Sequence, residues 1–326
     1  MSLTDADLNS ENKELADFLT TLGNYYKISN DKYRSGTFYK ASKIVSDYPR
    51  PISSGFDISN YPGVGTSVVS EINEFLSTGT SKRLQDLETK YADKRDIIEG
   101  FRSIYGIGPV KALDLYNKGL RSLDDIWFHG NLNESQKKGI IWKDHIDLPI
   151  PREEMTVIEY FICQALKPLQ EQYNFKWDIA GSYRRKEPFS GDIDLLIEQV
   201  SDISMDLILS YLSNIIVETL AKGNTKFMGI LRLNENNNGH RIDIRLVKSS
   251  SYSAALMYFT GSQVFNILMR SRANELNLVL NEYGLFDHNS VSLPIESETD
   301  IFNYLNIQYL YPHERIRDLQ YLNIMQ

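Results

Sequence analysis

The chain has 326 residues, of which 42% are hydrophobic and 24% are charged, and its formal net charge is −8. It contains no run of about 18 apolar residues, the usual minimum for a membrane span, and its polar, acidic first ten residues do not resemble a secretory signal. A single cysteine, Cys163, excludes an intrachain disulfide. We therefore expect a soluble intracellular protein without membrane contact, with Cys163 buried in the core.

The length suits two or three domains, and no long segment is basic. Residues 1–90 carry 10 basic and 12 acidic residues, residues 91–150 carry 9 of each, and residues 151–326 carry 16 and 22. Non-specific affinity for nucleic acid comes from Lys and Arg side chains that neutralise phosphates. Any contact with DNA must therefore come from local clusters and from backbone groups.

Residues 1–90 are expected to form a helical domain. Apolar residues recur at helical spacing in Leu15–Leu22 and in Phe38–Tyr48, and Pro49 ends the second segment. A third amphipathic stretch, Val68–Leu76, follows a glycine-rich turn.

Two Gly-x-Gly turns are the main feature of the helical part. Gly63 and Gly65 flank Val64, and Gly106 and Gly108 repeat the pattern in a second predicted helical domain, residues 91–150. Glycines allow a tight turn and leave N–H groups free to approach a phosphate at the start of the next helix. The pair predicts helix-hairpin-helix motifs that hold DNA backbones without reading sequence.

Beyond residue 150, helix and strand patterns alternate. We expect a domain of residues 151–262 with a mostly antiparallel sheet and helices on one face, and a small mixed subdomain of residues 263–326, which gives an α+β fold. The expected elements are a helix from Glu153, strands Trp177–Ala180 and Ile193–Glu198, a helix Met205–Lys222, strands Thr225–Leu233 and His240–Val247 joined by a hairpin turn at 234–239, a helix from Val264, and a last core of Ile301, Phe302, Tyr304 and Leu305.

Three aspartates form the centre of the predicted site. Asp192 and Asp194 stand two residues apart in a strand pattern, so their carboxylates face the same side. Asp243 lies in a second strand that alternates charged and apolar residues. If the strands are neighbours, the three carboxylates converge, which suits Mg²⁺ and two-metal phosphoryl or nucleotidyl transfer. The alternative is solvated aspartates on an edge strand.

A small-residue turn precedes the aspartates. Gly181 and Ser182 would expose backbone N–H groups to phosphate oxygens, with Arg184 and Arg185 as nearby charge partners. This combination favours a phosphate-binding site over an ordinary turn.

Together, these motifs resemble the family X DNA polymerases over nearly the whole chain. The resemblance implies a lyase-type N-terminal domain, a helix-hairpin-helix subdomain, a nucleotidyltransferase-type palm and a C-terminal subdomain that binds the nascent base pair. It is carried by Tyr61–Thr66, Gly106–Pro109, Ile150–Met155, Gly181–Asp194, Thr225–Gly229, Arg241–Arg245, Tyr258–Ser262 and Asn281–Tyr283.

The resemblance also implies roles for single residues. The three aspartates would bind two Mg²⁺ ions, with Mn²⁺ as an alternative, and Asp243 would activate the primer 3′-hydroxyl. Arg245 and Glu282 would take part in an open-to-closed switch, the hairpin turns would hold a monovalent cation, and the Gly261–Ser262 peptide would be cis. The implied nucleotide contacts come from Ser182, Arg185, Gly191, Asp192, Tyr258, Phe259, Gly261 and Asn266. The implied DNA contacts come from Gly63, Gly65, Gly106, Gly108, Lys226, Arg241 and Arg270.

The N-terminal domain departs from the family at the lyase site. Glu71 occupies the position of the lysine that forms a Schiff base with 5′-deoxyribose phosphate, and Ser67 occupies that of a phosphate-binding lysine. A carboxylate forms no imine, so we expect no lyase activity and no lyase nucleophile. Arg34 and Arg83 match basic positions of the family. Pro149 replaces an arginine that contacts the triphosphate.

The predicted function is repair-type, DNA-directed DNA synthesis that fills short gaps with dNTPs and releases pyrophosphate. The expected partners are gapped or nicked DNA, dNTPs and repair proteins such as a ligase. We expect a monomer in the nucleus or, for a viral protein, in the infected-cell cytoplasm or the virion. Two alternatives stay open: a template-independent nucleotidyltransferase and a non-catalytic DNA-end binding protein.

Overall fold

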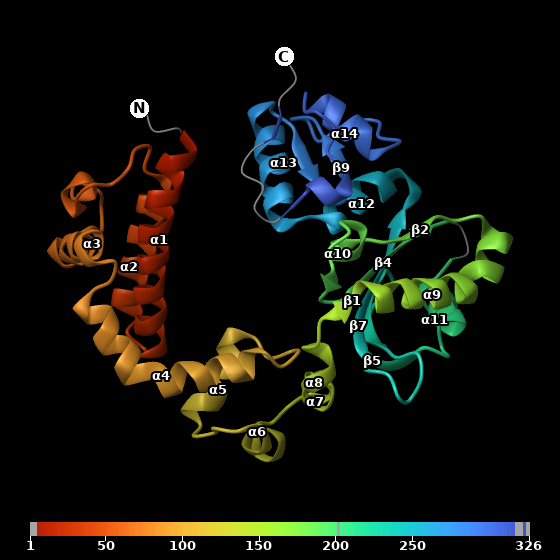
Figure 1. Ribbon diagram of the computed structural model, residues 1–326, viewed down its shortest axis with the longest axis horizontal. Coiled ribbons are helices and arrows are strands. Elements are labelled where there is room, and N and C mark those ends of the chain that lie inside the picture. Colours follow the sequence, from red (N-terminus) through yellow and green to blue (C-terminus); the bar gives the residue numbers. More distant parts are fainter. Residues whose placement is uncertain (1–4, 201–202, 317–321, 324–326) are drawn as a thin grey trace. The chain divides into compact units, whose positions relative to one another are not determined.

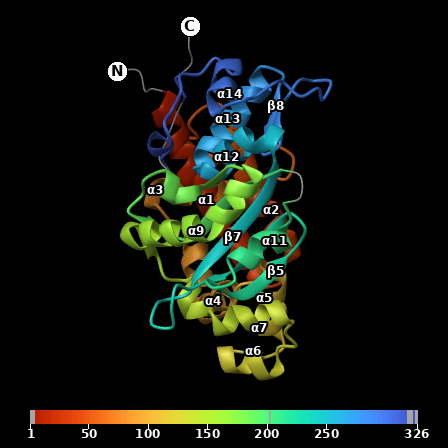
Figure 2. The ribbon, with the colours of Figure 1, turned by 90° about the vertical axis from the view of Figure 1, so that its right-hand side faces the viewer.

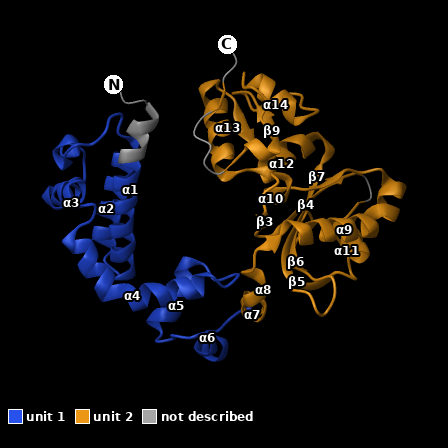
Figure 3. Cartoon of the chain, in the orientation of Figure 1, with its two compact units in different colours: residues 1–133 blue, residues 134–326 orange. Residues whose placement is uncertain are grey.

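A computed structural model gives the fold of the chain and describes residues 5–200, 203–316 and 322–323, with side chains from Asn12 on. The chain divides into two compact units, residues 1–133 and residues 134–326 (Figure 3). Within the described ranges, no helix combines the length and the apolar character that crossing a membrane requires.

The first unit is helical. Leu15, Leu19 and Leu22 of its first helix are buried against Phe38 and Ala41 of the second, as their helical spacing predicts. The helices are α1 (Asp5–Ile28), α2 (Lys32–Asp47), α3 (Thr66–Thr78), α4 (Lys82–Arg102), α5 (Pro109–Asn117) and α6 (Leu123–His129), with a 3₁₀ turn η1 (Gly55–Ile58) before α3 (Figure 1).

Both Gly-x-Gly turns lead directly into a helix. Gly63 and Gly106 have φ angles of +95° and +81°, a backbone region that favours glycine. Gly65 and Gly108 are the N-cap residues of α3 and α5. The first N–H groups of both helices therefore lack intrahelical partners, as at any helix start.

The second unit is mixed. Its first two helices lie in the polar stretch before residue 150. The elements are α7 (Glu134–Ile141), α8 (Lys143–Ile146), β1 (Ile150–Pro151), α9 (Arg152–Tyr173), β2 (Trp177–Ile179), α10 (Gly181–Arg184), β3 (Phe189–Ser190), β4 (Ile193–Gln199), α11 (Met205–Tyr211), β5 (Ile216–Lys222), β6 (Lys226–Leu231), β7 (His240–Lys248), η2 (Ser249–Ser251), α12 (Tyr252–Thr260), α13 (Gln263–Glu275), β8 (Val279–Asn281), β9 (Gly284–Phe286), α14 (Glu298–Tyr304) and η3 (Pro312–Glu314).

The central sheet has the strand order β2-β4-β7-β6-β5. Only β4 and β7 are parallel, which confirms the prediction of a mostly antiparallel sheet. Helices α9 and α11 cover one face (Figure 2), where Ile193 and Ile242 join the core. Helix α12 packs on the other face against Leu196, so the prediction that the helices lie on one face is wrong in part.

Three further expectations need correction. The predicted helix Met205–Lys222 ends at Tyr211 and is followed by β5, because the β-branched run that begins at Ile215 pairs with β6 instead. Cys163 is only partly buried on α9. Tyr304 is 38% exposed and is not a core residue, whereas Phe302 is fully buried.

Candidate active site

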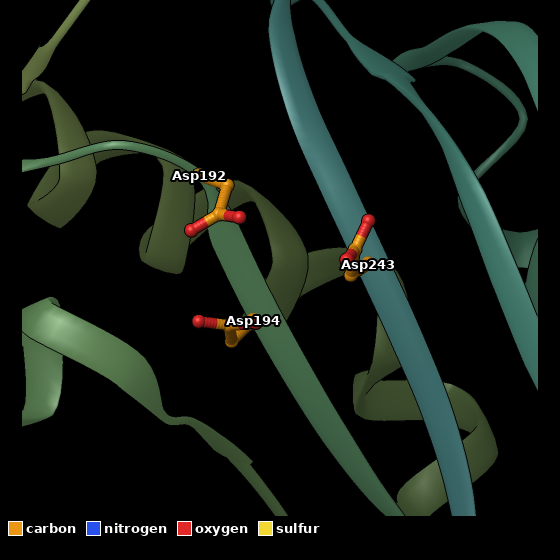
Figure 4. A group of neighbouring side chains, drawn as sticks. All are labelled: Asp192, Asp194 and Asp243. Atoms are coloured by element: carbon orange, nitrogen blue, oxygen red, sulfur yellow. The ribbon is translucent and has the colours of Figure 1, made fainter. Parts of the chain in front are cut away.

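The three aspartates meet because β4 and β7 are parallel neighbours. Their register pairs Asp194 with Asp243, and Asp192 stands one residue before β4. One carboxylate oxygen from each residue lies within 4.8 Å of the other two, and the side chains face a common space (Figure 4). The alternation that buries Ile193 and Ile242 against α9 and α11 places the carboxylates on the opposite face.

Burial is the largest influence on the pKa values of Asp194 and Asp243. Burial and repulsion from Asp243 raise the pKa of Asp194 to about 6, although Arg245 and Arg185 act in the opposite direction. Burial also raises the pKa of Asp243. Its Oδ1 atom is buried and accepts no hydrogen bond within the described chain. Three carboxylates with an unsatisfied buried oxygen are a donor set that fits a hard divalent cation.

Arg241 brings a positive charge next to two of the three carboxylates. Arg241 contacts the Asp192 carboxylate, and its Nε atom lies 3.8 Å from Asp243 Oδ1. The sequence prediction placed Arg241 on the strand face of Asp243 and assigned it to DNA, but it did not foresee the contact with Asp192. Arg241 and Asp243 lie on one face of β7 because they stand two residues apart in the strand.

The first residue of helix α10 lies close against the Asp194 carboxylate. The predicted Gly-Ser turn is in fact this single helical turn. Gly181 has a φ angle of +57°, and a Cβ atom there would lie 2.3 Å from Asp194 Oδ2. Only glycine allows the two to approach so closely. Ala180 fixes the pair further by donating its N–H to Asp194 O at 2.8 Å.

A cavity of about 740 Å³ opens beside the aspartates. It brings together every residue that the sequence assigned to the nucleotide, and Arg270 as well. The lining includes Ser182, Arg185, Gly191, Asp192, Asp194, Tyr258, Phe259, Gly261, Asn266 and Arg270. Asp243 borders a small adjoining cavity with Asp194, Arg245 and Phe259.

The wall of the cavity formed by α12 and α13 is held by local contacts. Asn266 donates a side-chain hydrogen bond to Tyr258 O at 2.7 Å. The rings of Tyr258 and Phe259 meet edge to face at 5.1 Å. The peptide bond between Gly261 and Ser262 is cis, as the resemblance implied.

Other predicted residues lie apart from this cluster or have different partners. Arg245 lies over the Phe259 ring at 4.5 Å, and no ion pair joins it to Glu282 within the described ranges. Lys226 is exposed on β6 and is aligned with Arg245. The hairpin glycines belong to the first unit.

At the position where the family has its lyase lysine, a buried glutamate pairs with an exposed arginine. Glu71 is 3% exposed, and its Oε1 lies 3.0 Å from Arg83 Nε. Arg83 also donates from Nη1 to Ser67 Oγ at 2.7 Å. Sequence reasoning identified all three positions but not this pairing.

Comparisons with known proteins agree with the fold and the site. Family models match four consecutive parts of the chain. They are described as a helix-hairpin-helix domain (residues 10–81), the fingers domain of DNA polymerase lambda (99–146), the DNA polymerase beta palm (149–249) and the DNA polymerase beta thumb (255–316).

Curated relatives match across nearly the whole chain. DNA polymerase lambda of Arabidopsis thaliana is 28% identical over 93% of this chain and 62% of its own length. DNA polymerase lambda of Rattus norvegicus is 30% identical over 93% of this chain and 56% of its own. The DNA polymerase type-X family protein pol4 of Schizosaccharomyces pombe is 24% identical over 94% of this chain and 65% of its own length.

The fold and the carboxylate triad define a nucleotidyltransferase-type palm preceded by helix-hairpin-helix elements. With this order of domains and these relatives, the chain resembles the family X DNA polymerases over most of its length. The resemblance expected from the sequence is thereby confirmed. The chain spans less than two thirds of the length of each of these relatives.

Proposed function

We propose that the chain is a DNA-directed DNA polymerase that fills short gaps by adding dNTPs to a primer 3′-hydroxyl with release of pyrophosphate. The observation that carries this proposal is the convergence of Asp192, Asp194 and Asp243 beside a cavity with cationic and aromatic walls. The names of the curated relatives, which are DNA polymerases, support the same reaction.

The residues of the site have different proposed roles in this reaction. Mg²⁺ bound by the three carboxylates would neutralise triphosphate charge and lower the pKa of the primer hydroxyl. Arg185 and Arg270 bring positive charge to the same cavity, and Ser182 adds a hydroxyl donor. Tyr258 and Phe259 form an aromatic wall that packs against the sugar and leaves little room for a 2′-hydroxyl.

The proposal extends to the first unit. The turns at Gly63–Gly65 and Gly106–Gly108 would hold backbones of gapped or nicked DNA, with a monovalent cation at each turn. The proposed domains are residues 1–90, 91–150, 151–262 and 263–326. We further propose that the protein is a monomer and that a ligase seals the DNA it has filled. Its proposed location is the nucleus or a virus-infected cell.

Lyase activity is not part of it. Glu71 is buried within α3 and is paired with Arg83, so no amine is available at this position for an imine. We expect no borohydride-trapped adduct with DNA that carries a 5′-deoxyribose phosphate, under conditions in which a lysine-dependent lyase is trapped. A trapped adduct would overturn this part of the proposal and leave the polymerase assignment untouched.

The decisive test is extension of a primer on a single-nucleotide gap with a 5′-phosphate, in Mg²⁺ and dNTPs at low salt. Wild type should add the templated nucleotide, and Asp243→Ala should lower the rate by about 10³-fold or more. Asp206→Ala is the matched control, because Asp206 is an exposed carboxylate on α11 that contacts Lys222 away from the site.

The same assay separates the alternatives. Addition without a template would favour a template-independent nucleotidyltransferase. DNA binding without any addition would leave a DNA-end binding protein. Equal rates for wild type and Asp243→Ala would refute the metal-site assignment.

A further inference from the structure

Glu187 holds the arginine that faces the nucleotide cavity. Arg185 Nε donates to Glu187 Oε1 at 2.9 Å, and Arg185 Nη2 contacts the same oxygen. On its other side, Arg185 Nη1 donates to Thr260 O at 2.5 Å. The Arg185 side chain is only 10% exposed, whereas that of Glu187 is 26% exposed. The buried cation therefore has a carboxylate of its own at the edge of the cavity.

The contact uses the edge of the guanidinium that best binds an anion. Nε and Nη2 point in parallel, which is why arginine grips carboxylates and phosphates with these two atoms. Glu187 occupies this edge. A phosphate that enters the cavity must displace Glu187 or use the remaining N–H groups at the far end of an arginine whose charge is already compensated.

Arg185 has little freedom to avoid this competition. A Cβ atom at Gly261 would lie 3.3 Å from Arg185 Nη1, so the guanidinium is seated closely against that turn. The main chain of Glu187 is fixed independently, because its N–H donates to Ser182 O at 3.1 Å. The turn is therefore held by this main-chain hydrogen bond, and the Glu187 carboxylate contacts Arg185.

We propose that Glu187 is a specificity-determining residue, an internal counter-ion that competes with the phosphates of the incoming nucleotide for Arg185. The inference rests on the proposed function, because it presumes that the cavity takes a dNTP. A triphosphate carries enough charge to displace the carboxylate, whereas nucleotides with fewer phosphates displace it poorly. Glu187 thus weakens nucleotide binding in general and excludes mono- and diphosphates in particular.

The test is a binding measurement that does not depend on turnover. The dissociation constants of dNTP and dNDP are measured in Mg²⁺ with gapped DNA whose primer ends in a dideoxynucleotide. The variants are Glu187→Gln, Arg185→Gln and the double variant. Glu187→Asp tests a shorter carboxylate, and Glu134→Gln, which removes an exposed partner of Lys137 on α7, is the control.

We expect Glu187→Gln to tighten dNTP binding by about tenfold, the order of one charge-assisted hydrogen bond, and dNDP binding by more. KM should fall with a much smaller change in kcat, and Glu187→Asp should stay closer to wild type. In the Arg185→Gln background, Glu187→Gln should have no effect, because the competition acts through Arg185.

Unchanged or weaker dNTP binding in Glu187→Gln, while the wild type still fills gaps, would overturn the inference and leave the proposed function standing. An equal gain in the Arg185→Gln background would also overturn it, since the carboxylate would then act without Arg185. Failure of the wild type to bind any dNTP would overturn both.

Discussion

Asp194 shows how a functional side chain is kept in an unfavourable place. It faces Asp243 from the paired position on a parallel strand, and burial raises its pKa to about 6. Uncompensated buried charge is costly. Arg245 and Arg185 offset part of this cost for Asp194, and Arg241 pairs with its neighbours Asp192 and Asp243.

This leads to a prediction for Asp194→Asn in the metal-free protein. A folded-state pKa of about 6 lies above the ordinary value of 3.8, so the folded chain binds more protons than the unfolded chain between these values, and Asp194 lowers stability as the pH rises through this window. The variant should therefore be more stable at pH 7 by about 1–3 kcal/mol and inactive in gap filling.

Chemical denaturation at pH 7 and at pH 4 in the presence of a chelator measures this effect. The gain should largely disappear at pH 4, where Asp194 is protonated in wild type as well. A variant that is less stable than wild type at pH 7 would contradict the electrostatic explanation.

At the scale of elements, a buried ion network joins α10, α14 and the segment after it. Glu298 accepts hydrogen bonds from Arg184 at 2.8 Å and from Arg315 at 3.1 Å. The Arg315 side chain is fully buried, and the two arginines hold the pKa of Glu298 low despite its burial. The network connects the turn beside Asp194 to the C-terminal subdomain.

Glu298→Gln should therefore be strongly destabilising. It leaves the buried guanidinium of Arg315 without a counter-charge, which typically costs about 3–5 kcal/mol. The same contribution is lost in wild type when the pH falls below the ordinary glutamate value of 4.5 and reaches the lowered pKa.

Urea unfolding at neutral pH measures the loss. Glu275→Gln is the matched control, because its partner Arg272 sits on the same subdomain and the Glu275 side chain is 57% exposed. A surface pair of this kind contributes about 0–1 kcal/mol. Similar losses of unfolding free energy in the two variants would show that the buried network stabilises the protein no more than a surface ion pair does.

At the scale of the whole molecule, the proposed function assigns the hairpin contacts with DNA to the first unit and the chemistry to the second. The hairpin glycines lie within residues 1–133, and the aspartates and the nucleotide cavity lie within residues 134–326. No long segment is basic, so backbone N–H groups at the hairpin turns should provide much of the hold on DNA.

Gly63→Ala tests this division. Gly63 has a φ angle of +95°, and Gly119, which lies outside both hairpins, has one of +91°. An added methyl group meets Lys40 Cδ only at 3.9 Å at Gly63 and nothing within 4 Å at Gly119, so both variants introduce similar backbone strain. We expect Gly63→Ala to weaken binding of gapped DNA by about three- to tenfold with kcat nearly unchanged, and Gly119→Ala to leave binding intact.

Fluorescence anisotropy with labelled gapped DNA measures the affinity, and single-turnover extension at saturating DNA measures the chemistry. Equal weakening in both variants would mean that general destabilisation, rather than the hairpin, controls DNA binding.

The sequence by itself determined the periodic helices of the first unit, the Gly-x-Gly turns and the alternation in β7 that places Asp243 beside Arg241. These features are local, because helical and strand periodicities fix which side chains share a face. The order of the motifs along the chain was also enough to predict the resemblance to the family X DNA polymerases. Local pattern was insufficient for Met205–Lys222, where pairing of β5 with β6 overrides a helical interpretation.

Only the tertiary structure decided which distant groups meet. The parallel pairing of β4 with β7 brings Asp194 to Asp243, and packing of α12 beside α10 places Thr260 against Arg185. The pairs Arg83–Glu71 and Arg184–Glu298 likewise join residues from different elements. Charge partners of this kind leave no periodic trace in a sequence, because long side chains meet through space and not through a fixed spacing along the chain.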